Sequence, residues 1–130
     1  MIGLDTSAII DLFKEEKSLL NLLKNIDDKI VSTIMNYQEL TFGLDPFNSK
    51  HQIEMGYYEA LFNDIDLIFL TKKSSKKSSE IWWELKKKGR IIGEFDCMIA
   101  GILLINNVNK IITRNAKHFE KIKDLKVIPY

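Results

Sequence analysis

The sequence is poor in cysteine, in proline and in net charge, and each shortage excludes a class of protein. Its one cysteine, Cys97, allows no intrachain disulfide and no multi-cysteine zinc site, and it points weakly to a reducing compartment. The 19 basic and 18 acidic residues leave a net charge of +1, so no overall field draws the chain to nucleic acid or to membranes. Only Pro46 and Pro129 punctuate the backbone, and no repeat or low-complexity linker divides it. Any electrostatic attraction must therefore be local.

The chain also lacks a long hydrophobic run. The longest, residues 97–105, is far shorter than the roughly 20 apolar residues of a transmembrane helix. The N-terminus carries no positive segment and reaches Asp5 too early for a signal peptide. With 130 residues, 45% of them hydrophobic, the sequence predicts one domain over 1–130 in a soluble, cytoplasmic protein that has no membrane partner.

What the chain does contain is an alternation of short apolar runs and longer amphipathic ones. The apolar runs predict strands at residues 2–4, 29–33, 66–70, 110–113 and 126–130. Apolar positions at helical spacing predict helices at 8–13, 17–26, 34–44, 48–64, 72–89 and 94–107, with a turn of helix around 116–122. Thr6 and Ser7 are expected to cap the first helix, and Ser32 or Thr33 the third. This alternation is typical of an α/β domain with a mainly parallel central sheet and helices on both faces.

Four polar residues stand out beside apolar neighbours. Asp5 follows the first strand, Glu39 lies two turns into the helix after the second, Asp96 opens an apolar helix, and Asn115 follows "IIT". Any one of them alone is more simply a helix cap or a surface group. Ligands of α/β sheets bind beyond the carboxyl ends of the strands, and several carboxylates at one such cleft would repel unless a cation neutralised them. An all-oxygen set suits Mg²⁺ or Mn²⁺, which would activate a water against a phosphodiester.

Four segments in order carry a resemblance to a known family: "LDTSAIIDLF" at 4–13, "STIMNYQELTFGL" at 32–44, "GRIIGEFDCMIAG" at 89–101 and "IITRNAKHFEKI" at 111–122. They resemble the PIN domain, and in particular the VapC family of toxin ribonucleases, over nearly the whole chain. The resemblance implies a PIN fold, a metal-dependent endoribonuclease that is usually the toxin of a toxin–antitoxin pair, a VapB-like antitoxin partner and a homodimer. By the same resemblance Asp5, Glu39 and Asp96 hold the metal. Asn115 matches a fourth ligand position at which some relatives carry Asp, so the chain departs there from a four-acid site.

Other residues near these segments have supporting or neutral interpretations. His118 stands where the family tends to have an acid, and we interpret it as an exposed histidine at a helix edge rather than a general base. Cys97 is interpreted as a small buried hydrophobe. We expect some hydroxyls to orient the acids and some basic side chains to position phosphate: these are Thr6, Ser7 and Thr113, and Lys14, Arg90 and Arg114.

Several alternatives remain open at this stage. Residues 72–90 hold eight basic residues around Trp82 and Trp83, which fits an RNA-binding surface. They also fit an ordinary helix that buries Ile81, Leu85 and one tryptophan and turns its lysines to water. The sequence also leaves two other functions possible for the whole chain. One is a PIN-like RNA- or protein-binding module without catalysis, and the other is a Mg²⁺-binding phosphoacceptor domain, which the lack of a lysine ending an inner strand disfavours.

Overall fold

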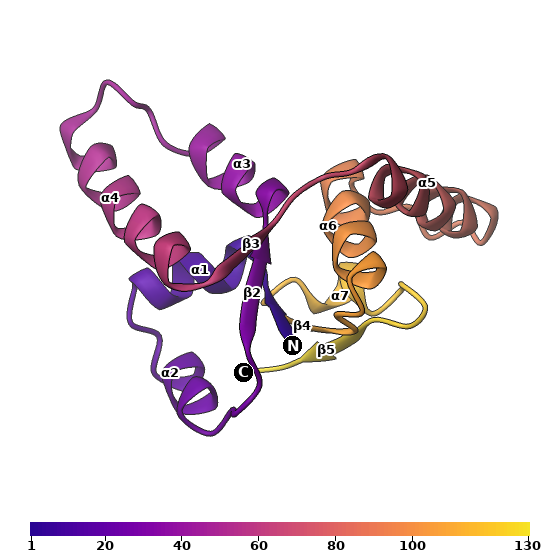
Figure 1. The fold of residues 1–130 in the computed structure, drawn as a ribbon, viewed down its shortest axis with the longest axis horizontal. Helices are drawn as coiled ribbons and strands as arrows, with labels where there is room; N and C mark the ends of the chain where they lie inside the picture. Colours follow the sequence, from indigo (N-terminus) through magenta and orange to yellow (C-terminus); the bar gives the residue numbers. More distant parts are fainter.

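The computed structural model describes residues 1–130, and a five-stranded sheet runs through its centre (Figure 1). Every neighbouring pair of strands is parallel. All five carboxyl ends therefore lie at one edge of the sheet, and the α/β fold predicted from the sequence is confirmed. In order across the sheet, the strands are β3 (Asp66–Ile68), β2 (Ile30–Thr33), β1 (Ile2–Leu4), β4 (Lys110–Ile112) and β5 (Lys126–Ile128).

Helices cover both faces of this sheet (Figure 1). On one side lie α1 (Thr6–Phe13), α2 (Lys17–Lys24) and α4 (Ser49–Asp64), and on the other lie α5 (Lys72–Lys87), α6 (Glu94–Ile105) and α7 (Ala116–Phe119). The remaining helix is α3 (Ile34–Phe42). It buries Met35 in the hydrophobic core on the α5 and α6 side of the sheet, and Leu40 in the core on the α1 and α4 side. No helix has both the length and the apolar character needed to cross a membrane.

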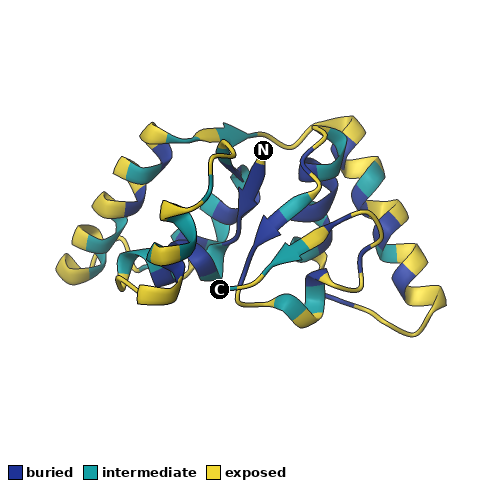
Figure 2. Ribbon diagram, turned by 90° about the horizontal axis from the view of Figure 1, so that it is seen from below, coloured by how far each residue is buried: buried dark blue, intermediate teal, exposed yellow.

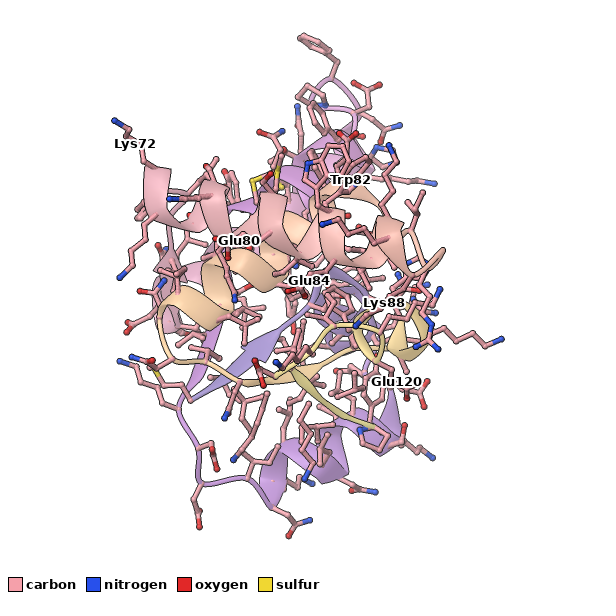
Figure 3. All side chains as sticks on the ribbon, turned by 90° about the vertical axis from the view of Figure 1, so that its right-hand side faces the viewer. Lys72, Glu80, Trp82, Glu84, Lys88 and Glu120 are labelled. Carbon is pink, nitrogen blue, oxygen red and sulfur yellow. The ribbon has the colours of Figure 1, made fainter.

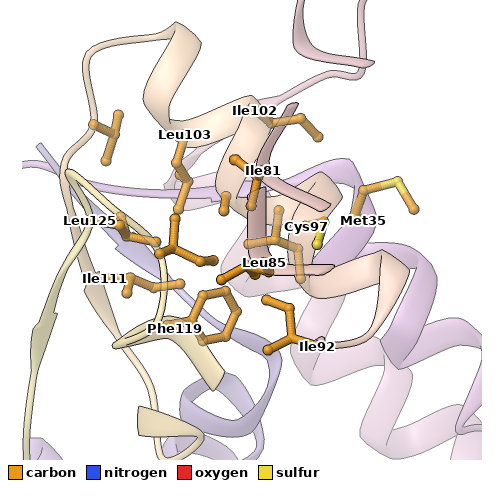
Figure 4. Packing of buried hydrophobic residues seen from close by; sticks show 14 of the residues in the cluster. Met35, Ile81, Leu85, Ile92, Cys97, Ile102, Leu103, Ile111, Phe119 and Leu125 are labelled. Carbon is orange, nitrogen blue, oxygen red and sulfur yellow. The ribbon is translucent and has the colours of Figure 1, made fainter. Parts of the chain in front are cut away.

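The core forms two layers, one on each face of the sheet. Successive strand residues point to opposite faces, so Ile111 packs with α5 and α6 while Ile112 packs with α1 and α4. Figure 4 shows the first layer, in which Leu85, Leu103 and Phe119 meet. Burial is densest along the sheet and on the inner faces of the helices, and the outer faces are exposed (Figure 2). The sheet is thus a rigid base for whatever its carboxyl edge carries.

Two glycines allow close packing in the α6 layer. A Cβ on Gly3 of β1 would lie 2.7 Å from Leu103 Cδ1, so glycine lets α6 approach the central strand. A Cβ on Gly101 of α6 would lie 2.9 Å from the backbone oxygen of Ser74 and from the backbone nitrogen of Ser78 on α5. These approaches fix α6, and with it Asp96, against the sheet and α5.

Four predicted strands are shorter in the structure than in the sequence-based assignment: β2 and β4 by one residue, and β3 and β5 by two. β3 ends at Ile68, which pairs with Thr33, the last residue of β2, so Phe69 and Leu70 have no strand left to pair with and are exposed. β5 ends at Ile128 for the same reason, since its neighbour β4 ends at Ile112. The backbone partner, rather than the apolar run, sets the end of each strand.

The caps of the helices are partly as predicted. Thr33 caps α3 as expected, and its hydroxyl accepts from the backbone N–H of Asn36. The prediction for the first helix is wrong: Asp5 occupies the N-cap, while Thr6 and Ser7 are the first two residues of α1. Their hydroxyls are therefore available for contacts with other parts of the chain.

Candidate active site

A buried polar network lies where β1, β2 and β4 end. β1 is the central strand, with β2 on one side and β4 on the other, so these three carboxyl ends are adjacent. Asp5 follows β1, Thr33 ends β2 and Thr113 follows β4, and all three residues are buried. The structure therefore places the first predicted site residue at the carboxyl edge of the sheet, where α/β folds bind ligands.

Asp5 is the centre of the network, and both of its carboxylate oxygens accept hydrogen bonds. Asn36 Nδ2 donates to Oδ1 at 3.0 Å, while Thr113 Oγ1 and Ser7 Oγ donate to Oδ2 at 2.6 and 3.3 Å. Asp5 also stands at the N-terminus of α1, where the helix dipole favours negative charge. These contacts explain how a carboxylate that is only 3% exposed is tolerated without a basic partner.

The sequence analysis missed the role of Asn36. This residue is 1% exposed, its side-chain oxygen accepts from the backbone N–H and hydroxyl of Thr33, and its amide group donates to both Asp5 and Thr6. One side chain thus caps α3 and orients an acid that follows a different strand. The signal available in the sequence was "TIMN" at 33–36, in which the polar residue three positions after a threonine cap closes a capping box.

Glu39 is joined to the same network through Thr6. Thr6 Oγ1 donates to Glu39 Oε1 at 2.7 Å and accepts from Asn36 Nδ2 at 3.1 Å. A chain of hydrogen bonds therefore runs from the amide of Asn36 through a hydroxyl to the second acid. The expectation that Thr6, Ser7 and Thr113 supply hydroxyls to the acids matches the contacts that the structure contains.

Asp96 lies in the first turn of α6, and its carboxylate faces His118 of α7. His118 Nδ1 lies 2.7 Å from Asp96 Oδ2, and the side chain of Asp96 is 13% exposed. His118 is an exposed histidine of α7 as we interpreted it, with a side chain that is 44% exposed, but its imidazole also contacts a carboxylate of the proposed site, which the sequence did not indicate. The only sequence signal was its place one helical turn after Asn115, and that spacing does not reveal its contact with α6.

The three acids act on one another electrostatically. Burial raises the pKa of the Asp5 carboxyl, and the charge of Asp96 raises it further, against the lowering effect of its hydrogen bonds. Burial also raises the pKa of Glu39, and the charges of Asp5 and Asp96 add to that shift. The carboxylates of the α1 N-cap, α3 and α6 are thus close enough to repel one another, which is the arrangement that a bound cation stabilises.

The donor chemistry of this set fits a hard divalent cation such as Mg²⁺ or Mn²⁺, because three carboxylates provide only oxygen ligands. The cysteine next to Asp96 is not an alternative ligand, since Cys97 is buried in the α5–α6 layer and burial raises its pKa to about 11. In the orientations that the side chains adopt, no three acidic, histidine or cysteine groups are close enough together to hold a metal ion. Metal binding therefore requires at least one carboxylate side chain to turn.

The remaining predicted residues are spread around this centre. Asn115 caps α7, its side chain is exposed, and its backbone N–H donates to Thr113 Oγ1. Arg114 donates its backbone N–H to Ser7 Oγ but directs its guanidinium to Asp11, with Nε 3.3 Å from Oδ2. Arg90 lies in an exposed loop before α6. Lys14 follows the last residue of α1, at the end of the helix that is far from Asp5.

The basic segment at 72–90 forms α5 on the outside of the molecule, and Figure 3 shows its outward side chains. Ile81 and Leu85 are buried as predicted, and Trp83 is the more exposed of the two tryptophans. Lys86 Nζ lies 4.9 and 4.8 Å from the centres of the two indole rings. The outer face of α5 carries two acids one turn apart, Glu80 and Glu84, as well as its lysines, so the charge of this face is mixed. This arrangement matches a solvated helix face.

Comparison with known proteins gives one consistent result. The model of the PIN domain family matches residues 2–125 of this chain. The chain is 30% identical over 125 residues to ribonuclease VapC1 of Methanocaldococcus jannaschii. This match covers 95% of this chain and 82% of that protein. It is also 25% identical over 124 residues to the tRNA(fMet)-specific endonuclease VapC of Shigella flexneri. This second match covers 95% of this chain and 92% of that protein.

A solved structure shows the same arrangement of elements. The structure of VapBC2 from Rickettsia felis, bound to a DNA fragment from the promoter, contains a chain that matches this fold with a TM-score of 0.85. The two chains are 25% identical, and the match covers 100% of this chain and 99% of that one. The match to the family model over residues 2–125 and the fold match over the whole chain agree along nearly the full length. The chain belongs to the PIN domain family and is of the VapC type.

Proposed function

We propose that the protein is a divalent-metal-dependent endoribonuclease that acts as the toxin of a toxin–antitoxin pair. One observation carries the proposal: three carboxylates, from the N-cap of α1 and from α3 and α6, repel one another at the carboxyl edge of a PIN domain, and no lysine or arginine neutralises them. The names of the relatives, ribonuclease VapC1 and tRNA(fMet)-specific endonuclease VapC, support RNA as the substrate.

In this proposal Asp5, Glu39 and Asp96 hold the cation, which is Mg²⁺ or Mn²⁺, and Asn115 completes the site at its exposed edge. A bound divalent ion supplies a water of lowered pKa and stabilises negative charge on the phosphate. The protein contributes orientation, since each acid has a neutral or imidazole donor that fixes one oxygen. Arg90 and Arg114, both exposed, are the cations that we assign to the RNA phosphates, and Lys14 is a more remote candidate.

A cleavage assay on structured RNA with titrated Mn²⁺ tests this function. Asp96→Asn and Glu39→Gln keep the size of each side chain and remove its charge, so we expect the cleavage rate to fall by more than the roughly 10–100-fold typical of losing an outer partner of a metal. The matched control is Asp64→Asn, because Asp64 is exposed at the end of α4 and has no recorded side-chain bond. Undiminished cleavage by Asp96→Asn, or full cleavage in EDTA, would contradict the proposal.

The same preparations separate the other two functions. RNA binding without cleavage at any metal concentration supports a non-catalytic PIN-like module. A stable phosphoprotein after incubation with a small phosphodonor supports a phosphoacceptor domain. The lack of a lysine after an inner strand disfavours this last function, since β1, β2 and β4 are followed by Asp5, Ile34 and Thr113.

We also propose a VapB-like antitoxin as the protein partner, a homodimer as the working assembly and the cytoplasm as the location, where such a toxin meets its RNA. The solved relatives that support the partner are toxin–antitoxin complexes. A hollow between α3 and α4, lined in part by Leu44, Pro46 and Met55, is apolar enough to receive a segment of another protein. A small protein encoded next to this gene should copurify with the chain and inhibit RNA cleavage. Sedimentation should give twice the 15.1 kDa of the chain.

A further inference from the structure

Two phenylalanine rings lie parallel to each other, one from each of the helices that carry Glu39 and Asp96. The rings of Phe42 and Phe95 have an interplanar angle of 10° and centroids 6.5 Å apart. Phe95 packs against the core layer of α5 and α6, so its position is fixed. Phe42, in contrast, is 75% exposed. A flat aromatic face is therefore open to solvent over a rigid support.

The position of this pair in the chain places it next to the proposed active site. Phe42 follows Glu39 by three residues on α3, which puts the two side chains on the same face of the helix. Phe95 directly precedes Asp96 in the first turn of α6. The aromatic pair thus connects the two helices that supply two of the three acids, and an RNA strand held at the acids would pass it.

Electrostatics alone gives this protein little affinity for RNA. Three carboxylates at the site repel phosphate, and the net charge of +1 provides no long-range attraction. The guanidinium of Arg114, one of the cations proposed to position phosphate, forms an ion pair with Asp11, which weakens its attraction for phosphate. Binding energy that does not depend on charge is therefore needed near the acids, and stacking of a base on an aromatic ring supplies it for any base.

We propose that the open face of Phe42 stacks an unpaired base next to the phosphodiester that is cleaved, with Phe95 as its support. This inference rests on the proposed ribonuclease function and adds a binding residue to it. A base inside a duplex has no free face, so stacking on Phe42 requires a base that is unpaired. Phe42 is accordingly a binding residue that selects unpaired RNA.

The test compares two fluorescent probes of equal charge, decaadenylate and a ten-unit ribose-phosphate oligomer without bases. Affinity is measured by fluorescence anisotropy in EDTA, so that no cleavage occurs. We expect Phe42→Ala to weaken decaadenylate binding about 10-fold and to leave binding of the baseless oligomer unchanged. Phe42→Trp should retain the affinity for decaadenylate, while Phe42→Leu, which is apolar without a π-face, should lose it. The matched control is Ile53→Ala on α4, since Ile53 is also 75% exposed.

Three results would overturn the inference. The first is equal binding of both probes by wild-type protein and Phe42→Ala. The second is retention of affinity by Phe42→Leu, which would indicate an apolar contact rather than stacking. The third is a change of oligomeric state in Phe42→Ala at unchanged RNA affinity, which would assign the ring to a protein interface. None of these measurements requires cleavage, so a failure of the ribonuclease proposal would be seen separately, in the assay with Mn²⁺.

Discussion

Asn36→Asp is the substitution that most directly tests how the buried network is held together. The new carboxyl keeps the size of the side chain and can still accept from Thr33, but it replaces the donor that lies 3.0 Å from Asp5 Oδ1 by an oxygen. A lost hydrogen bond to a charged group costs about 1.5–3 kcal/mol. Two carboxylates at this distance repel by about 5 kcal/mol at an effective dielectric constant of 20. This exceeds the roughly 4 kcal/mol needed to protonate a carboxyl of pKa about 4 at pH 7, so one of the two takes up a proton.

The expected loss of unfolding free energy is therefore about 4 kcal/mol at pH 7. It should disappear near pH 4, where the protonated carboxyl of the pair donates to the other. The sign follows from linkage: the pair has a raised pKa in the folded state, so its stability is present at acid pH and is lost as the pH rises through that pKa. Urea unfolding of wild type and variant at a series of pH values measures this difference.

The control for this prediction is Asn21→Asp, an exposed position on α2, which should change the free energy of unfolding by less than about 0.5 kcal/mol. A pH-independent loss in Asn36→Asp would mean that the packing of the side chain, rather than its bond to Asp5, stabilises the fold. No loss at pH 7 would refute the assignment of the amide as donor to Asp5.

Three further predictions concern the cation and the packing of the site. His118→Ala should weaken Mn²⁺ binding about 10-fold in calorimetry, because Asp96 loses its orienting partner, and His118→Asn, which keeps a donor at the δ position, should restore part of it. The pKa values of Asp5 and Glu39 are raised, so protons should compete with Mn²⁺ above the usual carboxyl range, and affinity should fall by up to about tenfold per unit of pH for each group as the pH decreases. Gly101→Ala should lower the free energy of unfolding in urea by about 1–3 kcal/mol, because the added methyl group meets the backbone of α5; an unchanged midpoint would contradict that packing.

Most of the fold could be predicted from the sequence, because the periodicity of apolar residues reports local structure directly. The strand and helix positions follow from periods of two and 3.6 residues, and their alternation implies a parallel sheet. The ends of β3 and β5 could not be predicted in this way. An apolar run continues past Ile68, but the strand stops there because the partner residue, Thr33, is the last of β2. Pairing is a property of two segments and is not visible in one.

The candidate site likewise contains residues that a local sequence pattern indicates and residues that only long-range contacts reveal. Asp5, Glu39 and Asp96 were found because polar residues interrupt apolar segments beside strand ends, and the family segments supported them. Asn36 and His118 were missed because their partners lie 31 and 22 residues away in the sequence. Their importance comes from contacts across the fold, which no local pattern records.

The way in which the acids are held is itself an argument for a cation. A lysine or arginine among them would stabilise the metal-free protein better than neutral donors do, since an opposite charge favours the ionised carboxylate. The structure has instead an amide, three hydroxyls and an imidazole at these oxygens, and its lysine and arginine ion pairs lie elsewhere. Neutral donors fix the positions of carboxylate oxygens without cancelling their charge. A site arranged in this way keeps its negative potential available, and a small divalent cation is the ligand that gains most from it.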